Sequence, residues 1–130
     1  MGAWGIGIFE NDDAMDFVGD LVDGEASLEA ALAVGGGYVE APDASIALAA
    51  AEVVASLAGA PSPSLPKEAR DWVAAQGGLP DTTLVTRALQ AVEGATSGES
   101  ELVELWEEAG EDGWREPVND LRARLTSLQT

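Results

Sequence analysis

Glycine and proline divide this chain of 130 residues into short stretches, and each stretch carries a helical repeat of apolar side chains. The stretches are too short for a long coiled coil, and there is almost no strand-like alternation. Short loops between short helices favour a compact bundle with mixed crossing angles. The sequence therefore predicts an all-α fold, a compact bundle of six or seven short helices, in a single helical domain that spans residues 1–130.

Capping residues and glycines set the limits of the predicted helices. Asn11 or Asp12 caps the first helix, Gly94 ends the fifth, and Ser97 caps the sixth with Glu101 as its reaching-back partner. The alanine-rich third helix is the best candidate for a central one surrounded by the others. The predicted ranges are 12–24, 25–34, 42–58, 66–76, 81–93, 97–109 and 112–128.

Residues 1–9, MGAWGIGIF, are glycine-rich and apolar. Three glycines in so short a stretch disfavour a regular helix. We expect an irregular N-terminal arm whose larger side chains, Trp4, Ile6, Ile8 and Phe9, pack on the body of the domain. The alternation of glycine with apolar residues also allows a short strand here.

Twenty-four acidic residues against six basic ones give a formal net charge of −18. DNA, RNA and anionic membranes need a positive patch, so the charge argues against all three as ligands. A basic protein or a metal ion suits this field better. A salt-adapted or GC-rich host would produce the same composition without any such partner, and the sequence leaves both explanations open.

The chain contains no histidine and no cysteine. This removes the commonest general base, the usual partners of a serine nucleophile and the soft-metal sites. The sequence therefore predicts a non-enzymatic protein without a cofactor. The absence of cysteine, of a signal peptide in Met1–Phe9 and of a membrane-length apolar window predicts a cytoplasmic location.

Aspartates crowd the first predicted helix. Asp12, Asp13, Asp16 and Asp20 recur at spacings that bring several of them to one helix face. Converging carboxylates are what a hard cation such as magnesium needs, so these four residues are candidate metal ligands. Acids in a first turn also satisfy free N–H groups and the helix dipole, which explains the cluster without a metal.

A second acidic feature lies between two tryptophans, Trp106 and Trp114. Aromatic rings beside carboxylates can bind a basic partner through cation–π and ionic contacts. Packing of the two rings at a helix–helix corner is the alternative. The candidate partner-binding residues of this turn are Glu107, Glu108, Glu111 and Asp112.

Glu52 lies in the otherwise apolar third helix. A buried carboxylate needs a partner or stays protonated. We expect either a structural ion pair, with Arg87 or Arg122 as the partner, or a position at a partly exposed edge of the helix.

The opening MGAWGIGIFENDDAMDF resembles a family of small bacterial proteins known as a domain of unknown function, whose members begin M-G-A-W-G-x-G-x-F-x-N-D-x-A-x-D-[FW]. The 49–55 run, the Leu65-Pro66 connector and the 104–114 region also look like this family. The resemblance implies a stand-alone, mainly helical domain with no established activity. It also implies that the arm and the Asn11–Asp16 turn belong together as one feature.

The leading hypothesis from the sequence is an acidic binding domain that docks a basic protein, with immunity or antitoxin-type inhibitors as one version. The first alternative is a magnesium-dependent hydrolase or transferase that uses the aspartates of the first helix. The second is a soluble homo-oligomer whose acidity reflects the host. The sequence does not predict the oligomeric state.

Overall fold

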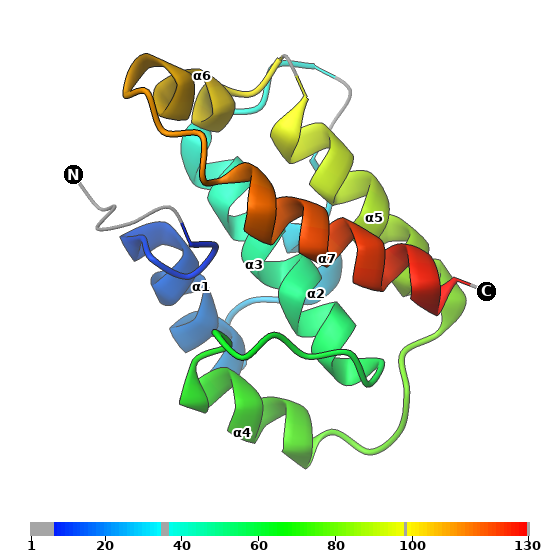
Figure 1. The fold of residues 1–130 in the computed structure, drawn as a ribbon. Helices are drawn as coiled ribbons and strands as arrows, with labels where there is room; N and C mark the ends of the chain where they lie inside the picture. The colour runs from blue at the N-terminus through cyan, green and yellow to red at the C-terminus, as the bar shows by residue number, and fades with distance from the viewer. Residues whose placement is uncertain (1–6, 35–36, 98, 130) are drawn as a thin grey trace.

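Seven α-helices make up the described part of the computed structural model, residues 7–34, 37–97 and 99–129 (Figure 1). These residues form no extended strand, and Val39 and Ser100 are joined by an isolated parallel bridge. The prediction of an all-α bundle of short helices is confirmed. The helices are α1 (Asp12–Val22), α2 (Leu28–Ala31), α3 (Ala41–Leu57), α4 (Lys67–Ala75), α5 (Thr82–Thr96), α6 (Glu101–Glu108) and α7 (Arg115–Leu128).

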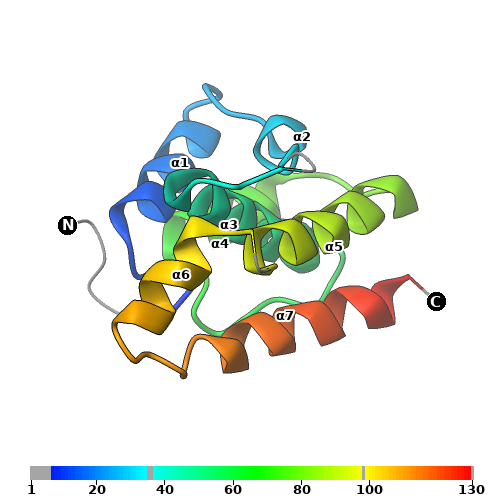
Figure 2. The same cartoon turned by 90° about the horizontal axis from the view of Figure 1, so that it is seen from above.

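α3 is the central helix, as its alanine content predicts, and it contacts all six others. Between Ala44 and Ala55 every residue except Ile46 is buried, because alanine lets neighbouring helices approach closely from several sides. α1 and α5 lie on opposite sides of α3 in both views (Figures 1 and 2). No helix in the described ranges combines the length and apolar character needed to cross a bilayer.

α1 begins at the predicted cap. The side chain of Asn11 accepts a hydrogen bond from the N–H of Ala14 at 2.8 Å, which satisfies one of the free donors of the first turn. α1 ends before Gly24, whose φ of +80° is a left-handed conformation that glycine adopts readily. The N–H of Glu25 then donates to the carbonyl of Asp20 at 2.8 Å, so the chain leaves α1 in a tight turn.

α2 is much shorter than the predicted range of 25–34. Ser27 is its cap, with the hydroxyl accepting from the N–H of Ala30 at 3.1 Å, so the helix begins only at Leu28. Residues 25 and 26 belong to the turn that follows α1. A single helical turn remains, and its Ala30 is exposed.

The predicted end of α5 at Gly94 is wrong. The helix continues through Gly94 to Thr96. A Cβ atom on Gly94 would lie 3.3 Å from Cγ2 of Val34, so the glycine marks a close approach of two segments instead of a helix end.

The predicted cap of α6 is also wrong. Ser100, not Ser97, is the N-cap, and its buried hydroxyl lies 3.5 Å from the N–H of Val103. Glu101 does not reach back within its own helix. Its carboxylate accepts from the N–H of Ala41 at 2.8 Å and so caps the N-terminus of α3. The parallel bridge beside it brings these two helix starts together.

The N-terminal arm packs on the body where it is described. Ile8 and Phe9 are buried, and the N–H of Glu10 donates to the carbonyl of Gly7 in an irregular turn. The expectation for Trp4 and Ile6 falls outside the described residues.

Glu52 is 2% exposed and forms an ion pair, but its partner is Arg124 instead of Arg87 or Arg122. Two guanidinium nitrogens donate to its two carboxylate oxygens at 3.0 and 2.8 Å. The same arginine also donates to the carbonyl of Ala60 at 2.9 Å and to Asp120 at 2.8 Å. Its hydrogen bond to Glu52 is the main cause that raises the pKa of Arg124 above the ordinary value. α3, α7 and the connector after α3 are therefore joined at one buried point.

Candidate functional site

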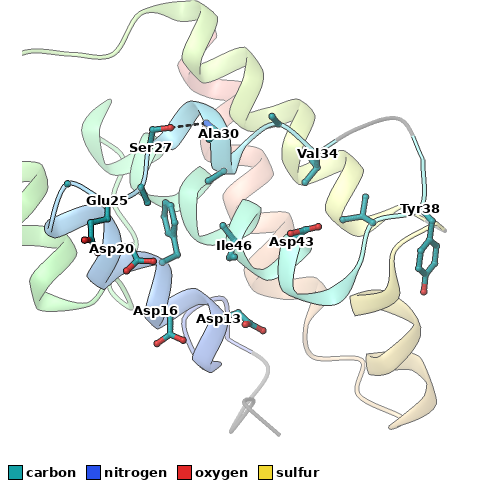
Figure 3. Close-up of a pocket in the computed structure, with 16 residues that line it drawn as sticks. Asp13, Asp16, Asp20, Glu25, Ser27, Ala30, Val34, Tyr38, Asp43 and Ile46 are labelled. Carbon is teal, nitrogen blue, oxygen red and sulfur yellow. Dashed lines mark hydrogen bonds between the residues drawn. The ribbon is translucent and has the colours of Figure 1, made fainter.

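A groove of about 820 Å³ opens between α1, α2 and the first turns of α3 (Figure 3). Its size lies within the range of about 300–1,000 Å³ that is typical of binding pockets. All of its described lining residues fall between positions 13 and 46 of the chain. The groove is therefore built almost entirely from one continuous segment.

Carboxylates form one wall of the groove. Asp13, Asp16 and Asp20 project from α1 toward it, because residues three and four apart share a helix face. Glu25 follows at the end of this wall, and Asp43 comes from the first turn of α3. Asp13 is half-buried and the other four are exposed. Since none of the five makes an ion pair or a side-chain hydrogen bond among the described residues, all five are available to a ligand.

Apolar side chains form the floor and the opposite wall. Phe17 is buried and Ile46 is half-buried beneath the opening. Figure 3 shows Ala30 and Val34 across from the α1 carboxylates, with Ile46 between the two sides. The groove thus offers negative charge along α1 and small apolar groups along α2, with Asp43 of α3 lying near Val34.

The four candidate metal ligands are only partly brought together. Asp13, Asp16 and Asp20 line the groove, whereas Asp12 does not. Nowhere in the described ranges do three or more carboxylates gather closely enough to hold a metal ion. The three groove aspartates follow the axis of α1 over about 10 Å, whereas a hard cation needs several oxygens at about 2.0–2.6 Å. Such spacing favours a ligand with several separated positive charges over a single ion.

The acidic turn between α6 and α7 already holds a cation from this chain. Arg115 lies 3.3 Å from Glu107 and 3.4 Å from Asp112, while Glu108 and Glu111 are exposed. Two of the four predicted partner-binding residues are thus engaged within the chain. Binding of a partner at this turn stays a prediction.

The two tryptophans beside the turn pack against each other. The rings of Trp106 and Trp114 are stacked at 4.9 Å between centroids, and the guanidinium of Arg115 lies 4.7 Å from the Trp114 ring centroid. Trp114 is buried, which agrees with the helix-corner alternative considered from the sequence. The aromatic–acidic corner therefore contributes to the packing between α6 and α7.

Basic residues are unevenly distributed along the chain. Residues 1–66 contain eleven acidic residues and neither lysine nor arginine, and all six basic residues occur from Lys67 onward. Within the described ranges, four of the six form ion pairs with acidic side chains: Lys67, Arg115, Arg122 and Arg124. The groove lies wholly within the cation-free half. Sequence reasoning missed Glu25 and Asp43 as site residues, and this absence of basic residues is the signal that could have pointed to them.

One end of the groove is fixed to α6. The hydroxyl of Tyr38 donates to the carboxylate of Glu104 at 2.8 Å. This hydrogen bond, with desolvation and the charge of Glu104 as smaller causes, raises the pKa of Tyr38 to about 12. Next to it, the N–H of Val39 donates to the carbonyl of Glu99 at 2.9 Å, and its carbonyl accepts from Glu101 at 2.8 Å. The segment that closes this end is thus held by main-chain and side-chain bonds.

Comparison with known proteins gives one match. A family model described as a domain of unknown function (DUF4259) matches residues 2–117, which is most of the chain. No curated protein and no solved structure matches the chain.

Proposed function

Since the chain belongs to the DUF4259 family, whose description assigns no activity, we propose its function from the groove: it is a non-enzymatic domain that docks a basic segment of a partner protein. The observation that carries this proposal is a concave site lined by five carboxylates and by no lysine or arginine among its described residues.

The chemistry of lysine and arginine suits both surfaces of this groove. Their aliphatic stems can cover the apolar floor of Phe17 and Ile46 while the charged heads reach the carboxylates at the rim. The net charge of −18 also steers a basic partner toward the domain and raises its association rate. A bacterial, cytoplasmic inhibitor of a cationic toxin, of the immunity or antitoxin type, is one form that such a domain can take.

The test uses octalysine as a defined basic probe in a nuclear magnetic resonance titration at low and high salt. We expect amide shifts at low salt to concentrate in residues 13–46 and the affinity to fall as salt rises, because exposed charge pairs are screened. Calorimetry under the same conditions then compares two variants with equal charge changes. Asp16→Asn/Asp20→Asn alters the groove, and Glu108→Gln/Glu111→Gln alters the acidic turn.

The groove variant should lose about 2- to 30-fold in affinity, since exposed charge pairs contribute roughly 0.2–1 kcal/mol each. The turn variant should lose less than about twofold, because a distant exposed charge is screened beyond a Debye length. Equal losses in the two variants, or shifts spread over all acidic residues, would show that only the net charge attracts the probe. The proposal would then be wrong.

Two further measurements test the other hypotheses from the sequence, the magnesium-dependent enzyme and the homo-oligomer. Calorimetric titration with magnesium up to millimolar concentration gives flat heats if the groove binds only spaced basic groups. Heat that disappears in Asp16→Asn/Asp20→Asn would support the metal-dependent alternative instead. Sedimentation of the unliganded protein measures whether it self-associates.

A further inference from the structure

The two walls of the groove differ in chemistry, and this difference restricts what can occupy it. The α1 wall presents Asp13, Asp16 and Asp20, whereas the α2 wall presents Ala30 and its small apolar neighbours. A uniformly charged ligand would leave the alanine wall without a favourable contact. An occupant with one basic side and one apolar side would use both walls.

The spacing on α1 adds a second constraint. Its three carboxylates are separated by three and four residues, which corresponds to rises of about 4.5 and 6 Å along the helix. A helix laid antiparallel beside α1 repeats the same rises when its basic residues occur at positions i, i+4 and i+7. An extended segment places same-side residues about 6.6 Å apart and loses register with the first pair.

The alanine wall permits the close approach that a helix needs. Ala30 and Ala33 are exposed, and Val34 is half-buried. Small side chains let helix axes approach to about 8–10 Å. Binding of an amphipathic helix by its apolar face in a groove is also a recurring mode of peptide recognition.

We infer that the groove binds an amphipathic α-helix of a partner protein, with lysine or arginine on the flank that faces α1 and small or aliphatic side chains on the flank that faces α2. This inference rests on the proposed docking function and specifies its ligand. The basic flank pairs with Asp13, Asp16 and Asp20, and the apolar flank covers Ala30 and Ala33.

The experiment compares two synthetic peptides of identical composition, rich in lysine, leucine and alanine. The first places lysines at i, i+4 and i+7 so that a helix has one basic and one apolar flank, and the second scrambles the order. Fluorescence anisotropy with the full chain measures affinity, and circular dichroism measures helix content on binding. The first peptide should bind about tenfold more tightly than the second, because a helix with one apolar flank can bury one or two more apolar side chains in the groove. It should also gain helix content on binding.

Two variants test the alanine wall. Ala30→Gln/Ala33→Gln makes it bulkier and polar without a change of charge, and both positions are exposed, so the fold tolerates it. The matched control is Ala75→Gln/Ala123→Gln, at exposed helix positions outside the groove. We expect the first variant to bind the amphipathic peptide about fivefold more weakly, because apolar contact is lost, and to bind the scrambled peptide with unchanged affinity.

The outcomes separate this inference from the proposed function. If the scrambled peptide binds the groove as tightly, or if the amphipathic peptide binds without gaining helix content, the helix inference is wrong while basic docking survives. If neither peptide shifts the groove residues at low salt, both proposals fail.

Discussion

Replacing Arg124 by methionine tests whether the buried ion pair with Glu52 holds the bundle together. The substitution keeps the aliphatic stem but removes both hydrogen bonds to a carboxylate that is 2% exposed, and it leaves the carbonyl of Ala60 without this donor. Breaking a buried pair by removing one partner costs about 3–5 kcal/mol, because the remaining charge is uncompensated. A domain of this size has about 5–15 kcal/mol of total stability, so Arg124→Met should lose a large share of it.

A double variant separates the ion pair from the rest of the site. Glu52→Leu/Arg124→Met replaces both partners by apolar side chains of similar volume, a change that is often neutral or stabilising by about 1–4 kcal/mol. It should therefore be clearly more stable than Arg124→Met alone. Asp120→Asn serves as the exposed control, since this carboxylate contacts the same guanidinium but is 63% exposed. The Asp120→Asn substitution should lower the free energy of unfolding by less than about 1 kcal/mol.

Urea unfolding followed by circular dichroism measures the free energy of unfolding of each variant, compared at a common m value, the slope of this free energy against urea concentration. The ranking expected is wild type and Asp120→Asn close together, the double variant near them, and Arg124→Met far below. A loss of less than about 1 kcal/mol in Arg124→Met would refute the argument, because a buried charge left without its partner cannot cost so little. If the double variant is no more stable than Arg124→Met, the packing of the Arg124 side chain, and not its charge, determines the loss of stability.

Four further predictions concern single positions and the net charge. Asn11→Ala removes the cap on Ala14 and should lower the free energy of unfolding by about 1 kcal/mol in urea; an unchanged midpoint would contradict the capping role. Gly19→Ala should raise it by about 0.5–1 kcal/mol, because Gly19 lies within α1 and an added Cβ meets nothing within 4 Å. Tyr38 is the only tyrosine, so an ultraviolet titration of the protein should give a midpoint near pH 12, and this midpoint should fall toward 10.0 in Glu104→Gln. Because the pKa of Tyr38 is higher in the folded than in the unfolded protein, its contribution to stability should be full below pH 10.0 and should fall as the pH rises toward about 12. Sodium chloride should raise the urea midpoint by screening the self-repulsion that comes with a net charge of −18, and a midpoint that falls with salt would contradict this.

Local signals in the sequence predict most of the helical architecture. The cap at Asn11 and the alanine-rich run of α3 depend on neighbouring residues alone, so they are visible without tertiary information. Glycine is more ambiguous, because the absence of a Cβ suits both a helix end and a close contact. Gly24 serves the first purpose, with a φ of +80° just after α1. Gly94 serves the second, because it lies inside α5 next to Val34, and this contact depends on tertiary structure.

The partner of Glu52 shows what local reasoning does not reach. Arg122 and Arg124 lie about 200° apart around α7, on opposite sides of the apolar stripe that includes Leu121 and Leu125. The stripe predicts which face is buried but not which edge meets α3. In the structure Arg122 turns toward α5, where it donates to Glu93 at 2.6 Å, and Arg124 turns toward α3. The groove could not be predicted from the sequence for the same reason, since its apolar wall depends on how α2 packs against α3.

The distribution of charge bears on whether the acidity is functional. A compositional bias of the host acts on exposed positions throughout a chain, so it gives no reason for lysine and arginine to be missing from residues 1–66 and present afterwards. In the second half, Arg122 and Arg124 link helices through ion pairs. The first half instead places unpaired carboxylates along α1 beside an apolar floor. Because a row of exposed carboxylates beside an apolar floor complements the charge and the aliphatic stems of a basic partner, the arrangement favours our proposal of docking over solubility as the reason for the charge.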